Sequence, residues 1–263
     1  MIDIGANLAH ESFDADREAL LERARKAGVQ AIVVTGSSRD SSRRALELAQ
    51  ARPGYLFATA GLHPHHADDY DAEHEAVFRD LLEHPACVAG GECGLDYFRD
   101  FSPRADQRRA FEAQLRLAID AGKPVFLHQR DAHVDFLPIL REHRPQLVDA
   151  VVHCFTDTAE AMADYLALDC HIGITGWICD ERRGGHLREP VATIPDDRLL
   201  IETDAPYLLP RTIRPKPKDR RNEPMYLPWV AQAIAEARGS TVEALGELTA
   251  ANARRFFRLP AAN

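Results

Sequence analysis

Several features that mark other classes of protein are missing from this sequence. No apolar run approaches the length of a membrane span. The N-terminal segment contains Asp3, His10 and Glu11 and has no basic region followed by an apolar stretch, so we expect no signal peptide and a cytoplasmic location. The five cysteines form no C-x-x-C pair. This pattern predicts that the thiols are reduced and buried, as is usual for proteins of the cytosol.

The usual nucleotide-binding loops are also missing, because the chain has neither a G-x-G-x-x-G motif nor a Walker loop. No change of composition, linker or internal repeat divides the 263 residues, which predicts a single domain over residues 1–263. The net charge of −9 argues against wrapping duplex DNA over a broad surface, since nucleic-acid affinity is largely phosphate neutralisation by Lys and Arg. A local basic patch still permits the protein to hold the end of a strand.

Strand-like and helix-like segments alternate along the chain. The expected strands are Met1–Ile4, Gln30–Thr35, Tyr55–Ala60, Cys87–Gly91, Pro124–Leu127, Leu147–Val152, Cys170–Ile174 and Leu199–Ile201. The expected helices are Asp14–Lys26, Arg39–Ala51, Asp71–Glu83, Arg104–Ala121, Asp131–His143, Thr158–Leu168, a short one near Gly185–Ala192, Pro228–Arg238 and Val242–Phe257. Apolar strands separated by helices predict an α/β fold with a parallel sheet, and about eight units favour a (β/α)8 TIM barrel. A doubly wound open sheet is the alternative.

Ionisable side chains follow several of these strands. The third expected strand is followed by His63, and the fourth, fifth, sixth and eighth by Glu92, His128, His153 and Asp204. In a barrel those ends meet at one rim, where active sites lie. A single histidine at a strand end is more often structural, but several ionisable groups buried together are costly without a metal. This set of nitrogen and oxygen ligands suits Zn²⁺, Mn²⁺ or Mg²⁺.

Cationic and aromatic residues offer contacts for a phosphate-bearing substrate. Arg130 comes two residues after His128, and a proline-broken basic loop with Arg220 and Arg221 follows Asp204. These arginines are candidates to hold phosphates. The aromatic residues Trp177, Tyr207 and Tyr97 either stack on unpaired bases or pack at the rim.

Five short motifs together resemble the TatD family of metal-dependent nucleases, in an order and spacing that hold across nearly the whole chain. They are GLHPH from residue 61, GECGLDY from residue 91, HQRDA from residue 128, HCFT from residue 153 and IETDAPYL from residue 201. The segments GITGWICDERRG (173–184) and RRNEP (220–224) extend the resemblance. Each motif alone is weak evidence, whereas the combination is specific.

The resemblance implies an amidohydrolase-type TIM barrel that hydrolyses DNA. It implies a 3′→5′ exonuclease acting on single-stranded DNA and RNA ends, with Mg²⁺ as the expected ion and Mn²⁺ or Zn²⁺ as alternatives. By position, Glu92 matches the family's bridging or primary metal carboxylate, and His128 and His153 match metal ligands. Asp204 matches a residue that touches metal and attacking water, and His63 matches a histidine near the scissile phosphate. We expect a monomer, and DNA repair is one cellular role that the family implies.

The substrate-binding group that we expect combines residues from several segments. Its members are Arg130, Arg220, Arg221, Asn222 and Glu202. Glu202 is also placed to orient a metal ligand from behind it. In the mechanism that we expect, Asp204 accepts a proton from the water that attacks phosphorus.

The chain departs from the family pattern after the first strand. Many members carry an H-x-H pair there that contributes to a second metal site, whereas this chain has Gly5 and Asn7. We therefore expect one metal ion or a weakly occupied second site.

Two other functions stay open on the sequence. The same barrel rim hydrolyses amides, esters and lactones in other enzymes. The basic loop favours a polyanion, and Glu92 stands where many amidohydrolases have a bridging lysine. A barrel that binds nucleic acid or a protein without catalysis is the second alternative, and the retention of Glu92, His128, His153 and Asp204 argues against it.

Overall fold

Eight strands alternate with helices in the computed structural model, which describes residues 1–261. The strands are β1 (Ile2–Ala6), β2 (Ala31–Val34), β3 (Leu56–Ala60), β4 (Cys87–Asp96), β5 (Val125–Arg130), β6 (Ala150–Val152), β7 (His171–Ile174) and β8 (Leu199–Ile201). The helices are α1 (Arg17–Lys26), α2 (Arg39–Ala51), α3 (Ala72–Glu83), α4 (Arg104–Ala121), α5 (His133–His143), α6 (Ala159–Ala167), α7 (Arg188–Thr193), α8 (Leu227–Arg238) and α9 (Val242–Phe257).

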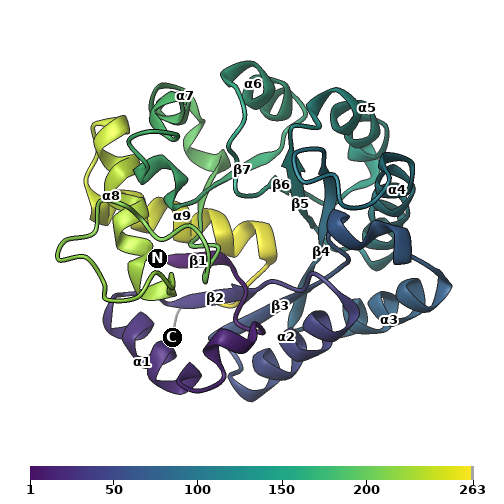
Figure 1. Ribbon diagram of the computed structural model, residues 1–263, viewed down its shortest axis with the longest axis horizontal. Coiled ribbons are helices and arrows are strands. Elements are labelled where there is room, and N and C mark those ends of the chain that lie inside the picture. The colour runs from purple at the N-terminus through teal and green to yellow at the C-terminus, as the bar shows by residue number, and fades with distance from the viewer. Residues whose placement is uncertain (262–263) are drawn as a thin grey trace.

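The strands form a parallel sheet in chain order from β1 to β8, and the helices surround it (Figure 1). The sheet closes just beyond the ends of its first and last strands. There the amide of Asp204 donates to the carbonyl of Gly5 at 2.8 Å, and the amide of Asn7 donates to the carbonyl of Ala205 at 2.7 Å. The prediction of a (β/α)8 barrel is confirmed, and the doubly wound alternative is wrong because β1 and β8 meet.

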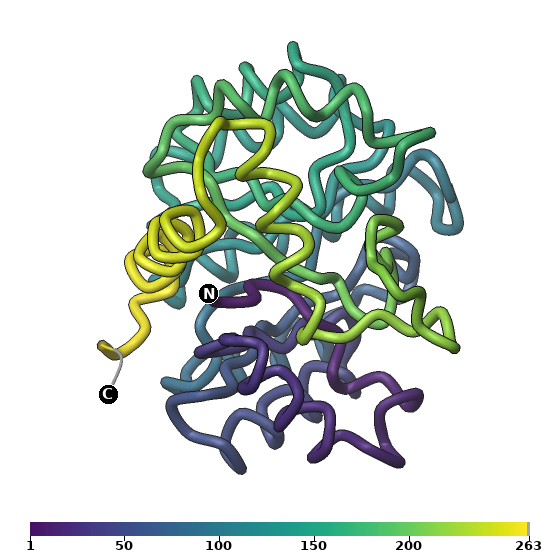
Figure 2. The backbone as a smooth tube through the Cα atoms, turned by 90° about the vertical axis from the view of Figure 1, so that its left-hand side faces the viewer, coloured from purple at the N-terminus to yellow at the C-terminus, as the bar shows by residue number. Residues whose placement is uncertain are grey.

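Two apolar layers hold the barrel together. The inner layer fills the barrel with side chains such as Ile4, Phe57 and Phe126, and it continues into Phe256 and Phe257 of α9. The outer layer lies between the strands and the surrounding helices. Strands buried on both faces explain the nearly continuous apolar runs in the sequence. Figure 2 shows α9, in yellow, on the opposite side of the molecule from the loop that follows β8.

The largest difference from the expected boundaries is in β4. The expected fourth strand stops at Gly91, but β4 continues to Asp96, and its ladder with β5 resumes at Cys93 after an irregularity. Gly94 makes this possible, because it has φ +147° and a Cβ there would lie 1.9 Å from the carbonyl oxygen of His128. Glycine therefore continues this strand rather than ending it.

No helix in the described part of the chain, residues 1–261, has the length and apolar character that crossing a membrane requires.

Candidate metal centre

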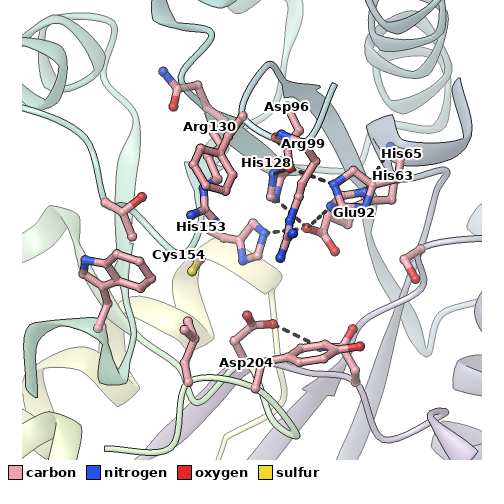
Figure 3. A pocket seen from close by; sticks show the side chains of 18 of the residues that line it. His63, His65, Glu92, Asp96, Arg99, His128, Arg130, His153, Cys154 and Asp204 are labelled. Atoms are coloured by element: carbon pink, nitrogen blue, oxygen red, sulfur yellow. Dashed lines mark hydrogen bonds and ion pairs between the residues drawn. The ribbon is translucent and has the colours of Figure 1, made fainter. Parts of the chain in front are cut away.

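One pocket of about 690 Å³ opens where the carboxyl ends of the strands converge. Its lining includes all five of the predicted catalytic and metal-binding residues, His63, Glu92, His128, His153 and Asp204. The structure thus brings together side chains from β4, β5 and the segments after β3, β6 and β8 (Figure 3). One positional expectation is wrong, since Glu92 and His128 lie within β4 and β5 rather than after them.

Glu92 is the centre of this group. Its Oε1 lies 2.8 Å from Nε2 of His153, 2.9 Å from Nδ1 of His128 and 3.4 Å from Nε2 of His63. Burial disfavours the charged carboxylate, but His63, His153 and the hydrogen bond from His128 outweigh it and hold the pKa of Glu92 well below its usual range. Glu92 is therefore an ionised carboxylate buried among three imidazole rings.

The donor atoms of this group fit a divalent cation. One ligand atom each from His63, Glu92 and His128 lies within 4.8 Å of the others. Two imidazole nitrogens and a carboxylate oxygen are a ligand set typical of Zn²⁺ and Mn²⁺, and Mg²⁺ accepts the carboxylate. His63 enters this set beside the predicted ligands Glu92 and His128, and His153 contacts the same Glu92 oxygen. The individual ligand roles stay predictions.

The three histidines differ in protonation. Burial lowers the pKa of His63 to about 4, so its ring is neutral near pH 7, and its Nδ1 accepts a hydrogen bond of 3.2 Å from the amide of His65. Burial also opposes the charge on the other two rings. It is outweighed by Asp96 and Glu92, which raise the pKa of His128, and by Glu202 and Glu92, which raise the pKa of His153 well above its usual value. Protons and a divalent cation are alternative ways of compensating these carboxylates, so metal binding releases protons.

Two of the histidines each have a further carboxylate next to the ring nitrogen that does not face Glu92. Glu202 is fully buried, and its Oε2 lies 3.3 Å from Nδ1 of His153 while its Oε1 accepts the amide of Cys154 at 2.5 Å. Asp96 similarly lies 3.4 Å from Nε2 of His128 through its Oδ2, which is also 2.8 Å from Nε2 of His65. Carboxylates in these places fix the ring orientation and tautomer of a ligand histidine.

Asp204 faces the cluster from the other side of the pocket, where β1 holds it. Its amide donates to the carbonyl of Gly5, and its Oδ1 accepts a hydrogen bond of 3.0 Å from Nδ2 of Asn7. Burial, with Glu92 and Glu202 as like charges, raises the pKa of Asp204 to about 7, although His153 acts in the opposite direction. Such a carboxyl group is suited to exchanging a proton near neutral pH.

The structure explains why Gly5 and Asn7 stand where an H-x-H pair would be expected. A Cβ on Gly5 would lie 2.3 Å from Oε2 of Glu202, so the buried Glu202 leaves no room for a larger side chain. Asn7 instead donates its amide to Asp204. The segment after β1 thus positions Asp204 in this chain.

Of the predicted substrate-binding residues, only Arg130 lines the pocket. Arg221 pairs with Asp16 and Glu223 at 2.7 and 2.8 Å, because the loop after β8 folds onto the start of α1. Asn222 is fully buried and donates to the carbonyl of Thr203 at 2.8 Å. Arg220 is exposed outside the lining, and Glu202 faces His153 rather than the pocket. These four residues therefore lie outside the pocket lining, and their contacts with substrate stay a prediction.

The pocket also contains residues that the sequence analysis did not select. They include Asp96, Phe98, Arg99 and Arg183. Two of the predicted aromatic residues, Trp177 and Tyr207, line it, but Tyr97 does not, because its hydroxyl donates to Asp135 at 2.7 Å. A signal for Arg99 was present in the sequence, since it follows the GECGLDY motif directly after Phe98.

Comparison with known proteins places this geometry in context. A family model described as TatD related DNase matches residues 2–258. A protein of Erwinia billingiae named 3′-5′ ssDNA/RNA exonuclease TatD is 52% identical over 261 residues, which cover 99% of this chain and 100% of the relative.

Solved structures agree with the sequence comparison. The TatD homologue YJJV of Escherichia coli K12 is 29% identical, with a TM-score of 0.89 over 99% of this chain and 98% of that one. A TatD family hydrolase of Entamoeba histolytica is 25% identical, with a TM-score of 0.87 over 99% and 98% of the two chains.

Proposed function

The chain belongs to the family of TatD-related DNases, and we propose that it is a metal-dependent 3′→5′ exonuclease that removes nucleotides from single-stranded DNA and RNA. The observation that carries the proposal is the position of Glu92, ionised among His63, His128 and His153 and facing Asp204 across one pocket. The polarity and the substrate come from the printed name of the Erwinia relative.

We propose that Glu92, His128 and His153 hold the ion with His63 beside them, and that Mg²⁺ is the physiological ion. The donor set supports a divalent cation, and carboxylate oxygens are the ligands that Mg²⁺ prefers. When bound, the cation supplies positive charge for the phosphoryl oxygens and makes water a stronger nucleophile.

The chain's own residues then have separate tasks. Asn7 occupies Oδ1 of Asp204, so the other oxygen, Oδ2, is available to take a proton from the attacking water. Glu202 and Asp96 hold the rings of His153 and His128. Arg99 and Arg130 line the pocket, and in residues 1–261 no carboxylate pairs with either guanidinium. They are therefore available for substrate phosphates.

A time course on single-stranded DNA with a 5′ label tests the proposal. With Mg²⁺ we expect a ladder that shortens from the 3′ end, and EDTA should stop it. Asp204→Ala should lower kcat by about 10²–10⁴-fold, the range for a lost general base. Internal cuts, or loss of the 5′ label first, would contradict the exonuclease polarity. No cleavage with Mg²⁺ or Mn²⁺, together with hydrolysis of a small ester or amide, would favour the amidohydrolase alternative.

A further inference from the structure

Aromatic and cationic side chains alternate along one wall of the pocket. The guanidinium carbon of Arg130 lies 4.0 Å from the ring centre of Phe98 and 5.7 Å from that of Trp177, and the guanidinium carbon of Arg183 lies 4.3 Å from Trp177. We call Phe98, Arg130, Trp177 and Arg183 the stacking wall. It joins the β4–α4 loop, the end of β5 and the segment after β7, and all four residues line the same pocket as Glu92.

The far end of the wall is fixed by a buried carboxylate. Asp180 is 3% exposed, and its Oδ2 accepts a hydrogen bond of 2.8 Å from Nε of Arg183. The indole Nε1–H of Trp177 donates to the carbonyl of Arg183 at 3.3 Å, so this polar group of the ring is satisfied within the protein. The ring and the guanidinium are thus held in place before any ligand binds, which lowers the entropy that binding must overcome.

The near end of the wall leaves its apolar and charged surfaces open. Phe98 is 53% exposed and lines the pocket, and the guanidinium carbon of Arg99 lies 5.7 Å from its ring centre. Arg130, in contact with it, has no carboxylate partner among residues 1–261. An exposed ring beside an uncompensated guanidinium matches a ligand that has both a flat π-face and an anionic group.

We propose that the stacking wall is the subsite for unpaired nucleotides next to the scissile bond. Bases stack on Phe98 and Trp177, and Arg130 between them holds a backbone phosphate. This inference rests on the proposed nuclease function, and it gives a physical reason why the enzyme would prefer single strands to duplexes. Paired bases are already stacked within a duplex and cannot enter, and stacking on aromatic rings tolerates every base.

Kinetics of two alanine variants test the wall. Phe98→Ala and Trp177→Ala should each raise KM for a single-stranded oligonucleotide about tenfold, within the range for one lost base stack, with kcat little changed. Hydrolysis of an abasic (tetrahydrofuran) oligonucleotide of the same length, which has no ring to stack, should keep its kcat/KM. Phe101→Ala is the matched control, since Phe101 is 66% exposed on the same loop but does not line the pocket. Unchanged KM in both wall variants would overturn the proposal.

Tryptophan fluorescence provides a measurement of binding without catalysis. The chain has two tryptophans, so Trp229→Phe leaves Trp177 as the reporter. In EDTA, oligothymidylate should quench this emission, whereas an abasic oligonucleotide of the same length and charge should not. Equal quenching by both would show phosphate binding without stacking and would overturn the proposal. If the wild type hydrolyses neither the normal nor the abasic oligonucleotide, the nuclease proposal fails, while the fluorescence result still decides whether bases bind the wall.

Discussion

Glu202 shows how one buried residue sets the chemistry of another. It lies behind His153, with Oε2 3.3 Å from Nδ1, and a carboxylate there accepts a hydrogen bond from that nitrogen. In the neutral ring, the form that can bind a metal, the lone pair of His153 is then on Nε2, the nitrogen that faces Glu92. Glu202 thus selects the tautomer in which His153 can act as a metal ligand.

Glu202→Gln should weaken metal binding even though Glu202 does not line the pocket. The amide group of glutamine can donate to Nδ1 of His153, which favours the tautomer with its proton on Nε2 and blocks the ligand lone pair. We expect Mn²⁺ affinity, measured by calorimetry, to fall about 10–100-fold, the effect of losing a partner behind a ligand.

The matched control for this substitution is Glu236→Gln on the exposed face of α8, which should bind Mn²⁺ like the wild type. If Glu202→Gln bound Mn²⁺ with the affinity of the wild type, Glu202 would have no positioning role.

At the scale of elements, the join between β1 and β8 depends on a buried carboxyl group. Asp3 in β1 is fully buried and accepts hydrogen bonds from the amide of Thr203 at 2.9 Å and from its hydroxyl at 2.6 Å. Burial raises the pKa of Asp3 from 3.8 to about 7, against the effect of these hydrogen bonds. The folded protein therefore holds a proton on Asp3 at pH values where the unfolded chain has lost it.

This pKa makes the stability contribution of Asp3 depend on pH. The contribution is fully present below pH 4 and is lost as pH rises through about 7. A pKa difference of one is worth about 1.4 kcal/mol, so the loss is on the order of 4 kcal/mol. Asp3→Asn, which resembles the protonated acid, should lack this dependence.

Urea unfolding of both proteins at pH 5 and pH 8 measures the difference. Between pH 5 and pH 8 the unfolding free energy of the wild type should fall by about 2–3 kcal/mol more than that of Asp3→Asn. Parallel changes in the two proteins would show that Asp3 titrates alike in the folded and unfolded states.

The order and type of the elements could be predicted from the sequence, but the local extent of β4 could not. Apolar strands and helical periodicity identified all eight units, because burial on both faces leaves a strong signal. The extension of β4 to Asp96 depends on the fit of Gly94 against the carbonyl of His128, a contact between strands that are distant in sequence. A pattern of single residues does not contain that information.

At the scale of the whole molecule, the barrel explains why the ionisable residues at the strand ends could be identified from the sequence, whereas of the arginines that line the pocket only Arg130 was. A parallel barrel brings the carboxyl ends of its strands together, so position alone gathered His63, Glu92, His128, His153 and Asp204. Loop residues follow no such rule. Arg221 is held by Asp16, about 200 residues earlier, whereas Arg99 enters the pocket from the β4–α4 loop.

The central claim is that the cluster around Glu92 binds the divalent ion on which hydrolysis depends. A Mn²⁺ titration followed by electron paramagnetic resonance, with 3′-end hydrolysis measured at each point, tests it most directly. We expect activity to rise in proportion to bound Mn²⁺ in the wild type. Glu92→Gln, with an unchanged metal-free melting curve, should lose both binding and about 10³-fold of kcat, since a catalytic ion supplies several kcal/mol. Undiminished Mn²⁺ binding by Glu92→Gln, or hydrolysis that saturates before the ion binds, would contradict the account.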